Sequence, residues 1–130
     1  MILAMLLLYR KRISMTNVNY PYDVLPIDWK PYDPNHNYCG PESSSISIFI
    51  CRRITFVDTN KCCWAHDQRY AIGGKEADRE YADRMFYEDM KICIKKAYKW
   101  YNPLYWRAMI QARARHYAVS EYGKKFFNYK

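Results

Sequence analysis

The stretch VDTNKCCWAHDQRY at residues 57–70 decides the fold, and its last nine positions hold two cysteines, a histidine, an aspartate and a tyrosine. The polar run at 58–60 supplies candidate helix N-caps, so the pattern predicts a helix that begins near Lys61. The paired glycines at 73 and 74 predict where that helix ends, because glycine readily adopts the backbone conformations that terminate helices. The helix therefore carries nearly all of the chemistry in this stretch.

His66 and Tyr70 lie one turn apart on the same face of the predicted helix, whereas Asp67 is rotated by about 100° from His66. The adjacent His66 and Asp67 side chains can thus address two different neighbours. A histidine that faces a substrate supplies a general base, and an aspartate that faces a cation supplies a metal ligand. A His-Asp dipeptide alone is ordinary, so this interpretation depends on the residues around it.

The rest of the chain predicts a mostly α fold. Residues 75–101 contain no Pro or Gly, and their apolar residues recur at spacings of three and four, which predicts a long amphipathic helix antiparallel to the first. Pro103 separates it from a third, arginine-rich helix predicted from Leu104 to about Glu121. Together these patterns predict a single small domain with two antiparallel central helices.

The first part of the chain does not have the pattern of a helix. Residues 16–42 contain five prolines and predict an irregular arm that leads into a loop. The alternating SSSISIFI at 43–50 predicts a short strand. We therefore divide the chain into an N-terminal arm at 1–36, a core at 37–101 and a basic aromatic helical segment at 102–130 that packs on the same domain.

The apolar run that opens the chain, MILAMLLLYRKR at 1–12, places its basic residues after the apolar ones, the reverse of a signal peptide. It is also shorter than the roughly 20 residues that span a bilayer. A buried strand, a membrane-surface anchor and a true start at Met5 or Met15 are the interpretations that remain. Secreted, virion-associated and membrane-peripheral locations all stay open.

A net charge of +8, from 21 Lys and Arg against 13 Asp and Glu, predicts an anionic partner, either phospholipid headgroups or nucleic acid. The sequence has no zinc-finger spacing, RNA-binding aromatic signature or basic leucine-zipper repeat, so nucleic acid rests on charge alone. The segment KKAYKWYNPLYWRAMIQARARHY at 95–117 combines aromatic and basic residues. It fits either a membrane-seating surface or a core face with a solvated rim.

Two further motifs flank the predicted helix. In NYCGPE at 37–42, Gly40 allows main-chain carbonyls to turn inward, and such oxygens are ligands that calcium prefers. In DREYADRMF at 78–86, Asp83 falls on the adjoining helix, where a second carboxylate can orient an imidazole. Asp78 lies in a near copy of the same motif and is the alternative to Asp83.

These motifs together resemble a family. YCG at 38–40, VDTNKCCWAHDQRY at 57–70 and ADRMF at 82–86 resemble the calcium loop, catalytic helix and second-carboxylate helix of secreted-type phospholipase A2. The resemblance covers about residues 37–90 and is closer to the compact viral and bacterial members. It implies a small phospholipase A2-like domain that hydrolyses the sn-2 acyl ester of glycerophospholipids with the help of Ca²⁺ at a phospholipid membrane surface.

The resemblance also implies roles for individual residues. Catalytic roles are expected for His66 as the base, Asp83 as its partner, Tyr70 as a donor to Asp83, and the Gly40 N–H as an oxyanion donor. Calcium ligands are expected from the Asp67 side chain and from the main-chain carbonyls of Tyr38, Gly40 and Glu42. Because Glu42 replaces the second glycine of the family loop, the alternative is an inactive scaffold that binds a membrane or a protein partner.

Five cysteines in 130 residues suit two disulfides and one leftover thiol in an oxidising compartment. The resemblance implies a disulfide between Cys39 and Cys63. It also implies a partner for Cys62 on the long helix, where Cys93 lies about one turn beyond the family position, and it leaves Cys51 unpaired. A zinc site formed by Cys39, Cys62, Cys63 and His66 is the alternative use of the cysteines.

Overall fold

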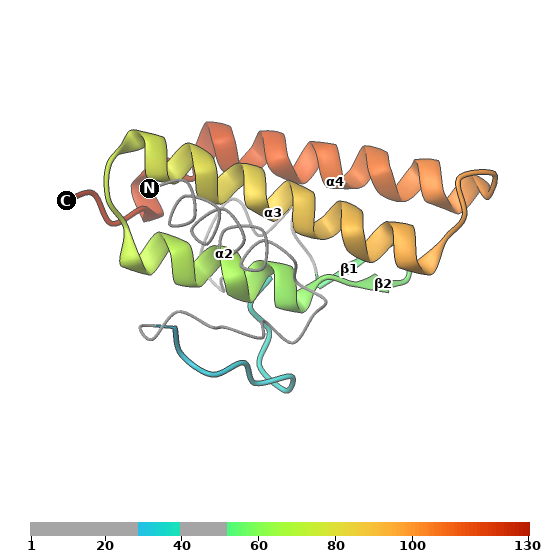
Figure 1. The fold of residues 1–130 in the computed structure, drawn as a ribbon, viewed down its shortest axis with the longest axis horizontal. Coiled ribbons are helices and arrows are strands. Elements are labelled where there is room, and N and C mark those ends of the chain that lie inside the picture. The colour runs from blue at the N-terminus through green and yellow to red at the C-terminus, as the bar shows by residue number, and fades with distance from the viewer. Residues whose placement is uncertain (1–28, 40–51) are drawn as a thin grey trace, which may run out of the picture.

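The computed structural model describes residues 29–39 and 52–130 and shows a mostly α fold with a small antiparallel sheet (Figure 1). The coarse fold class predicted from the sequence is therefore confirmed. Along the described residues the elements are β1 (Arg53–Ile54), β2 (Val57–Asp58), α2 (Asn60–Ile72), α3 (Glu76–Ala97), α4 (Pro103–Tyr122) and the short 3₁₀ helix η2 (Lys124–Phe126). No helix among these residues is long and apolar enough to cross a membrane.

Helix α2 begins and ends where the sequence predicts. It stops at Gly73, whose φ of +74° lies in the left-handed region that favours glycine. A Cβ on Gly73 would also lie 1.9 Å from the main-chain oxygen of Asn128. The glycine therefore both ends the helix and admits the C-terminal segment, which donates the Asn128 N–H to the Tyr70 carbonyl.

Helices α3 and α4 meet at a turn that differs slightly from the prediction. Helix α3 ends at Ala97 rather than near Tyr101, because Tyr98 is extended and donates its hydroxyl to the Thr55 carbonyl. Helix α4 begins at Pro103, and the Asn102 side chain caps it by accepting from the Leu104 N–H at 2.9 Å.

A two-residue hairpin that the sequence analysis did not predict precedes α2. Ile54 pairs with Val57, and the turn residues Thr55 and Phe56 have φ of 45° and 70°. Such turns usually contain Gly, Asn or Asp, so this sequence carried no signal for one. The strand predicted at 43–50 lies outside the described residues. Residues 1–28 of the predicted arm lie outside them as well.

Helix α3 lies between α2 and α4 and contributes the centre of the core (Figure 1). Phe86, Met90 and Ile94 from the predicted apolar stripe are almost completely buried. Ala108 and Ala112 face them from α4, and their small side chains allow the two helices to approach closely. The amphipathic pattern of residues 75–97 thus describes the packing of α3 correctly.

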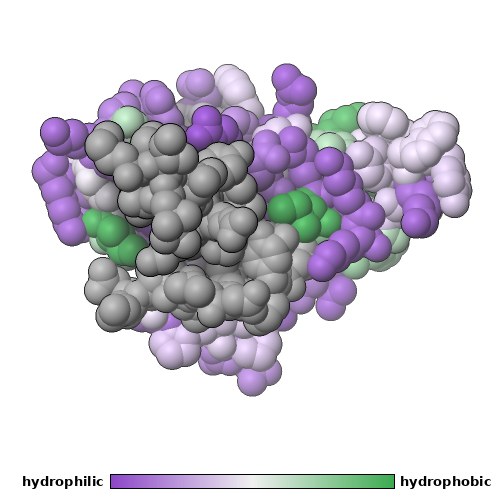
Figure 2. Space-filling model, viewed as in Figure 1, coloured by the Kyte–Doolittle hydropathy of each residue, from purple (hydrophilic) through white to green (hydrophobic). Residues whose placement is uncertain are grey.

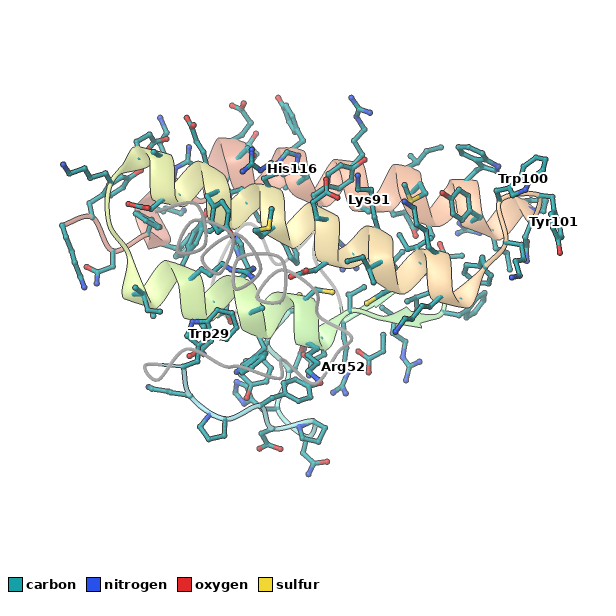
Figure 3. All side chains as sticks on the ribbon, viewed as in Figure 1. Trp29, Arg52, Lys91, Trp100, Tyr101 and His116 are labelled. Carbon is teal, nitrogen blue, oxygen red and sulfur yellow. A yellow bond between two sulfur atoms is a disulfide. The ribbon has the colours of Figure 1, made fainter. Side chains whose placement is uncertain are left out.

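The segment at residues 29–39 packs against α2. Trp29 lies edge-on to Trp64 at 5.3 Å between ring centroids, below α2 in the view of Figure 3. At the other end of the segment, the Cys39–Cys63 disulfide joins it covalently to α2. That disulfide, expected from the family resemblance, is confirmed.

The remaining described cysteines form a thiol contact. The sulfurs of Cys62 and Cys93 lie 3.7 Å apart with no bond joining them, so the second disulfide is absent. Because Cys39 and Cys63 are bonded to each other, they are not free thiolates for the alternative zinc site. Among residues 29–39 and 52–130 no group of three or more His, Cys, Asp or Glu side chains could hold a metal. Cys51 lies outside the described residues.

Asp89 is completely buried on α3, beside Arg69 of α2. The Arg69 Nη1 lies 3.5 Å from an Asp89 oxygen, which is long for a strong charge-assisted hydrogen bond. Burial raises the pKa of Asp89 to about 8, and the attraction of Arg69 offsets this only in part. The Arg69 guanidinium also lies over the Trp29 ring at 5.3 Å from its centroid, which helps to stabilise its charge.

Asp89→Asn should therefore flatten the dependence of stability on pH. Between the unfolded pKa of about 4 and the folded value, the folded protein holds a proton that the unfolded chain releases, so stability falls as pH rises. Denaturant unfolding at pH 5 and pH 8 should show a smaller loss in Asp89→Asn than in the wild type. Glu88→Gln, at the neighbouring partly exposed position, should keep the wild-type slope. Equal slopes in Asp89→Asn and wild type would contradict the assignment.

Candidate active site

The face of α2 that meets α3 brings His66 and Asp83 together. His66 Nε2 lies 2.9 Å from Asp83 Oδ1, and the two residues are 7% and 1% exposed. Asp78, the alternative in the near-copy motif, instead accepts from the Lys75 N–H at 2.9 Å and caps the start of α3. Asp83 is thus the carboxylate that lies beside His66.

Both oxygens of the Asp83 carboxylate have further donors. The Tyr70 hydroxyl donates to Oδ1 at 2.6 Å, and Arg79 Nη1 donates to Oδ2 at 2.9 Å. Burial and the bond to Asp83 raise the pKa of Tyr70, so its hydroxyl remains a donor. Charge-assisted bonds of this kind stabilise a buried carboxylate in its ionised form.

Arg79 is a residue of the site that the sequence analysis did not identify. It is 4% exposed, and it donates from Nε to Glu76 at 3.0 Å and from Nη1 to the Ser120 carbonyl at 3.3 Å. Glu76 also accepts from the Tyr129 hydroxyl, and these two bonds lower its pKa to about 2. The signal that could have identified Arg79 is its position four residues before Asp83 on one helix face.

The environment of His66 favours the neutral form of its imidazole. Its ring lies against Phe86 and Tyr70, with centroid distances of 4.7 and 4.2 Å. Burial lowers the pKa of His66, and the nearby Asp83 carboxylate counters this only in part. Because Nε2 is bonded to Asp83, it carries the ring proton, and Nδ1 is left as an acceptor. No residue in 29–39 or 52–130 donates a hydrogen bond to Nδ1. The ring can therefore accept a proton from a small molecule.

Asp67, the next residue on α2, is exposed, and helix geometry rotates it by about 100° from His66. Displacement of water by the surrounding protein raises the pKa of its carboxyl group to about 7, an effect that its exposure to solvent moderates. The described residues offer it no hydrogen bond or ion pair. An exposed carboxylate without a partner fits a cation ligand in charge and chemistry.

The disulfide holds the segment with another predicted calcium ligand, Tyr38, against α2. Cys63 lies one turn before Asp67 on α2, and its bond to Cys39 holds the neighbouring Tyr38 against the same helix. Gly40 and Glu42, the other two predicted ligands, lie outside the described residues, as does the predicted oxyanion donor at Gly40. A calcium site here would combine one carboxylate with main-chain carbonyls.

Asn60 fixes the chain that leads to this loop. Its fully buried side chain accepts from the Tyr38 N–H at 2.8 Å and donates to the His36 carbonyl at 2.7 Å and the Tyr32 hydroxyl at 3.2 Å. The sequence analysis considered Asn60 only as a helix cap. Its role depends on contacts more than 20 residues away along the chain, which a local pattern does not report.

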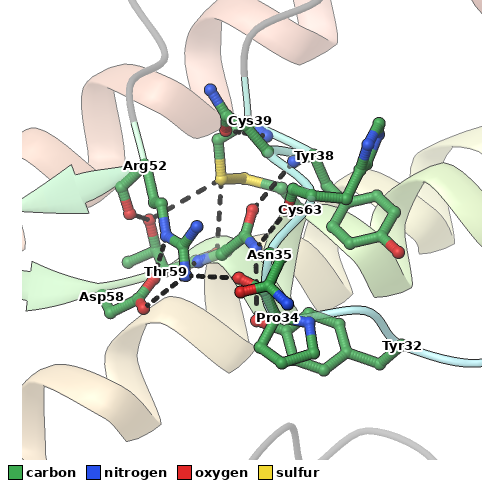
Figure 4. Close-up of polar contacts among 12 residues, drawn as sticks. Tyr32, Pro34, Asn35, Tyr38, Cys39, Arg52, Asp58, Thr59 and Cys63 are labelled. Atoms are coloured by element: carbon green, nitrogen blue, oxygen red, sulfur yellow. Dashed lines mark hydrogen bonds and ion pairs between the residues drawn. A yellow bond between two sulfur atoms is a disulfide. The ribbon is translucent and has the colours of Figure 1, made fainter.

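Arg52 and Asp58 form a second support beside the disulfide (Figure 4). Arg52 pairs with Asp58 at 3.2 Å and donates to the Pro34 carbonyl at 2.9 Å. Thr59 donates its hydroxyl to the Arg52 carbonyl and accepts from the buried Arg115 of α4 at 2.8 Å. The entry to α2, the segment at 29–39 and α4 are thereby connected.

No protein-family model, curated protein or solved structure compared with the chain matches it. The chemistry of the site therefore follows from its own geometry. That geometry places a buried histidine on a buried carboxylate, and a second carboxylate, which has no partner among residues 29–39 and 52–130, on an adjacent face of the same helix.

Gly123 is required for the position of Tyr70. A Cβ at this residue would lie 2.5 Å from the Tyr70 hydroxyl and 2.4 Å from the Val119 carbonyl oxygen. Gly123→Ala should therefore lower the free energy of unfolding by about 1–3 kcal/mol, the usual cost of overpacking, as measured by denaturant unfolding. Lys124→Ala, at the exposed neighbouring position, is the control and should be nearly neutral. An unchanged stability in Gly123→Ala would show that Tyr70 is not confined in this way.

Proposed function

We propose that the protein is a phospholipase A2-like enzyme that hydrolyses the sn-2 acyl ester of glycerophospholipids in the presence of Ca²⁺. The observation that carries the proposal is the 2.9 Å contact between His66 Nε2 and a buried Asp83 that also accepts from Tyr70 and Arg79. The motifs that resemble the secreted-type family point to the same reaction. The adjacent Asp67 supplies the carboxylate that a calcium-dependent reaction needs.

In the proposed reaction, His66 Nδ1 removes a proton from a water molecule as its oxygen attacks the ester carbonyl. Asp83 stabilises the imidazolium that forms, and its bonds to Tyr70 and Arg79 keep it ionised and in place. The proton on Nδ1 then passes to the oxygen of the departing lysophospholipid as the acyl C–O bond breaks. Water is the nucleophile, so no acyl-enzyme is formed.

The calcium ligands in this proposal are the Asp67 carboxylate and the main-chain carbonyls of Tyr38, Gly40 and Glu42. The ion, when bound, supplies positive charge next to the ester carbonyl oxygen. The Gly40 N–H is the proposed second donor to that oxygen, a kind of interaction typically worth about 3 kcal/mol in the transition state.

The second candidate is a scaffold without catalysis that binds a membrane or a protein partner through its basic aromatic surface. The observation that favours it is Glu42, which stands where the family loop has glycine. The two candidates differ in whether fatty acid is released, and both differ from nucleic-acid binding, which rests on charge alone.

His66→Ala should reduce fatty-acid release from mixed phospholipid vesicles by about 100-fold or more, because it removes the general base. Release is measured with purified protein in millimolar Ca²⁺. His116→Ala removes the partly buried histidine that stacks on Tyr87 and is the matched control, which should keep activity. Full activity in a folded His66→Ala protein would reject the mechanism.

Asp67→Asn should abolish both calcium binding, measured by calorimetry, and calcium-dependent release, because an amide cannot replace the charge of the carboxylate. A chelator should have the same effect on the wild type. Glu80→Gln, an exposed change on α3, controls for the loss of one negative charge and should bind calcium normally. Release that continues undiminished in chelator would contradict a calcium-dependent site.

A further inference from the structure

The turn between α3 and α4 and the outward side of α4 expose large apolar side chains. Trp100 and Tyr101 are each 70% exposed at the turn, and Figure 3 shows both at the end of the molecule where α3 passes into α4. Trp106, Ile110 and Tyr117 follow on α4 and are 55%, 71% and 64% exposed. We name these five residues the outer aromatic face.

The α4 part of this face lies opposite the side that packs in the core. At about 100° per residue, positions 106, 110 and 117 fall within about 40° of one another around the helix. The buried Ala108, Ala112 and Val119 fall on the opposite side. Helix α4 thus has two apolar sides, and the described residues cover only one of them.

A shallow hollow of about 440 Å³ lies along the C-terminal half of α4. Its lining is made by Ile110, Arg113, Ala114, Tyr117, Ala118 and Tyr122. In Figure 2, pale surface of intermediate hydropathy gathers at the right-hand end of the molecule, beside purple hydrophilic surface. Exposed apolar side chains gathered in this way usually mark an interaction site.

The charge around the outer aromatic face is mainly positive, and the exposed Glu121, one turn beyond Tyr117 on α4, is the acidic residue at its far end. Between residues 90 and 120 the sequence contains seven Lys and Arg residues and no Asp or Glu. Arg107 and Arg113 lie on either side of the apolar positions of α4. The exposed members of this basic set are Lys95, Lys96, Lys99, Arg107 and Arg113, and none pairs with an acidic residue of 29–39 or 52–130. Arg115 is buried and belongs to the fold.

We infer that the outer aromatic face, with these five exposed cations, docks the protein on an anionic phospholipid surface. Trp and Tyr place an apolar body and a polar tip at headgroup depth, and Lys and Arg attract anionic lipid. A second copy of the chain would oppose two basic faces, so repulsion disfavours it as the occupant. Nucleic acid would match the charge but would not account for the exposed Ile110. The choice of lipid rests on the phospholipid substrate proposed above.

Vesicle binding by the full chain carrying His66→Ala tests this inference without turnover. In chelator, this protein should bind phosphatidylcholine vesicles that contain phosphatidylserine at least tenfold more tightly than phosphatidylcholine alone, as measured by co-sedimentation. Added salt should weaken the binding. Adding Trp106→Ala and Ile110→Ala to this protein should weaken its binding to the anionic vesicles at least tenfold, because less apolar area then enters the lipid interface. Both side chains are exposed, but Trp106 Nε1 donates to the Trp100 carbonyl at 2.7 Å, so the unfolding midpoint should fall only slightly.

Phe126→Ala is the matched control, because Phe126 is an aromatic residue that is 46% exposed on η2, near the C-terminal end. It should bind like its parent. The inference is overturned if the Trp106 and Ile110 changes leave vesicle binding intact, if the protein prefers nucleic acid to anionic vesicles, or if the face instead mediates dimerisation.

A monomeric short-chain phospholipid separates this inference from the proposed function. Wild-type hydrolysis of the monomer without binding to anionic vesicles would overturn the docking face and leave the enzyme intact. Vesicle binding through the face without hydrolysis of either substrate would uphold the docking face and reject the enzyme.

Discussion

The contact between His66 and Asp83 is the constraint on which the rest of the structure depends. It places an ionisable pair inside a helical core, where an unpaired charge would be strongly destabilising. The protein meets this cost with donors from two helices, Tyr70 on α2 and Arg79 on α3. Arg79 also contacts the Ser120 carbonyl of α4, so all three helices converge on one carboxylate. Stability and the proposed chemistry thus use the same atoms.

A second set of contacts holds the chain that leads into the proposed calcium loop. The Cys39–Cys63 disulfide fixes it covalently to α2, and the buried Asn60 satisfies its main-chain groups. Asp67 follows Cys63 by one helical turn and so lies on the side of α2 that carries the disulfide. The loop approach and the candidate metal ligand are therefore positioned by the helix that carries the base, so one rigid element sets the geometry of both.

Local sequence patterns predicted the parts of this structure that depend on neighbouring residues. The glycine pair ends α2, Pro103 begins α4, and helical spacing places His66 and Tyr70 on one face. The hairpin was missed because Thr55 and Phe56 adopt positive φ without a glycine, and Thr55 is held by bonds to Gln111 of α4 and to Tyr98, just after α3. The early end of α3 and the burial of Arg115 likewise arise from contacts between residues far apart in the chain. Arg79 alone could have been identified from spacing.

The tautomer of His66 is the most direct test of the central claim that a neutral imidazole on Asp83 is poised to accept a proton. Side-chain nitrogen NMR of labelled protein at neutral pH reads the state of both ring nitrogens. We expect a neutral ring with its proton on Nε2 and an unprotonated Nδ1, and we expect that signature to disappear in Asp83→Ala. A proton on Nδ1 with Nε2 unprotonated would contradict the account, because the ring would then have no acceptor facing the proposed water.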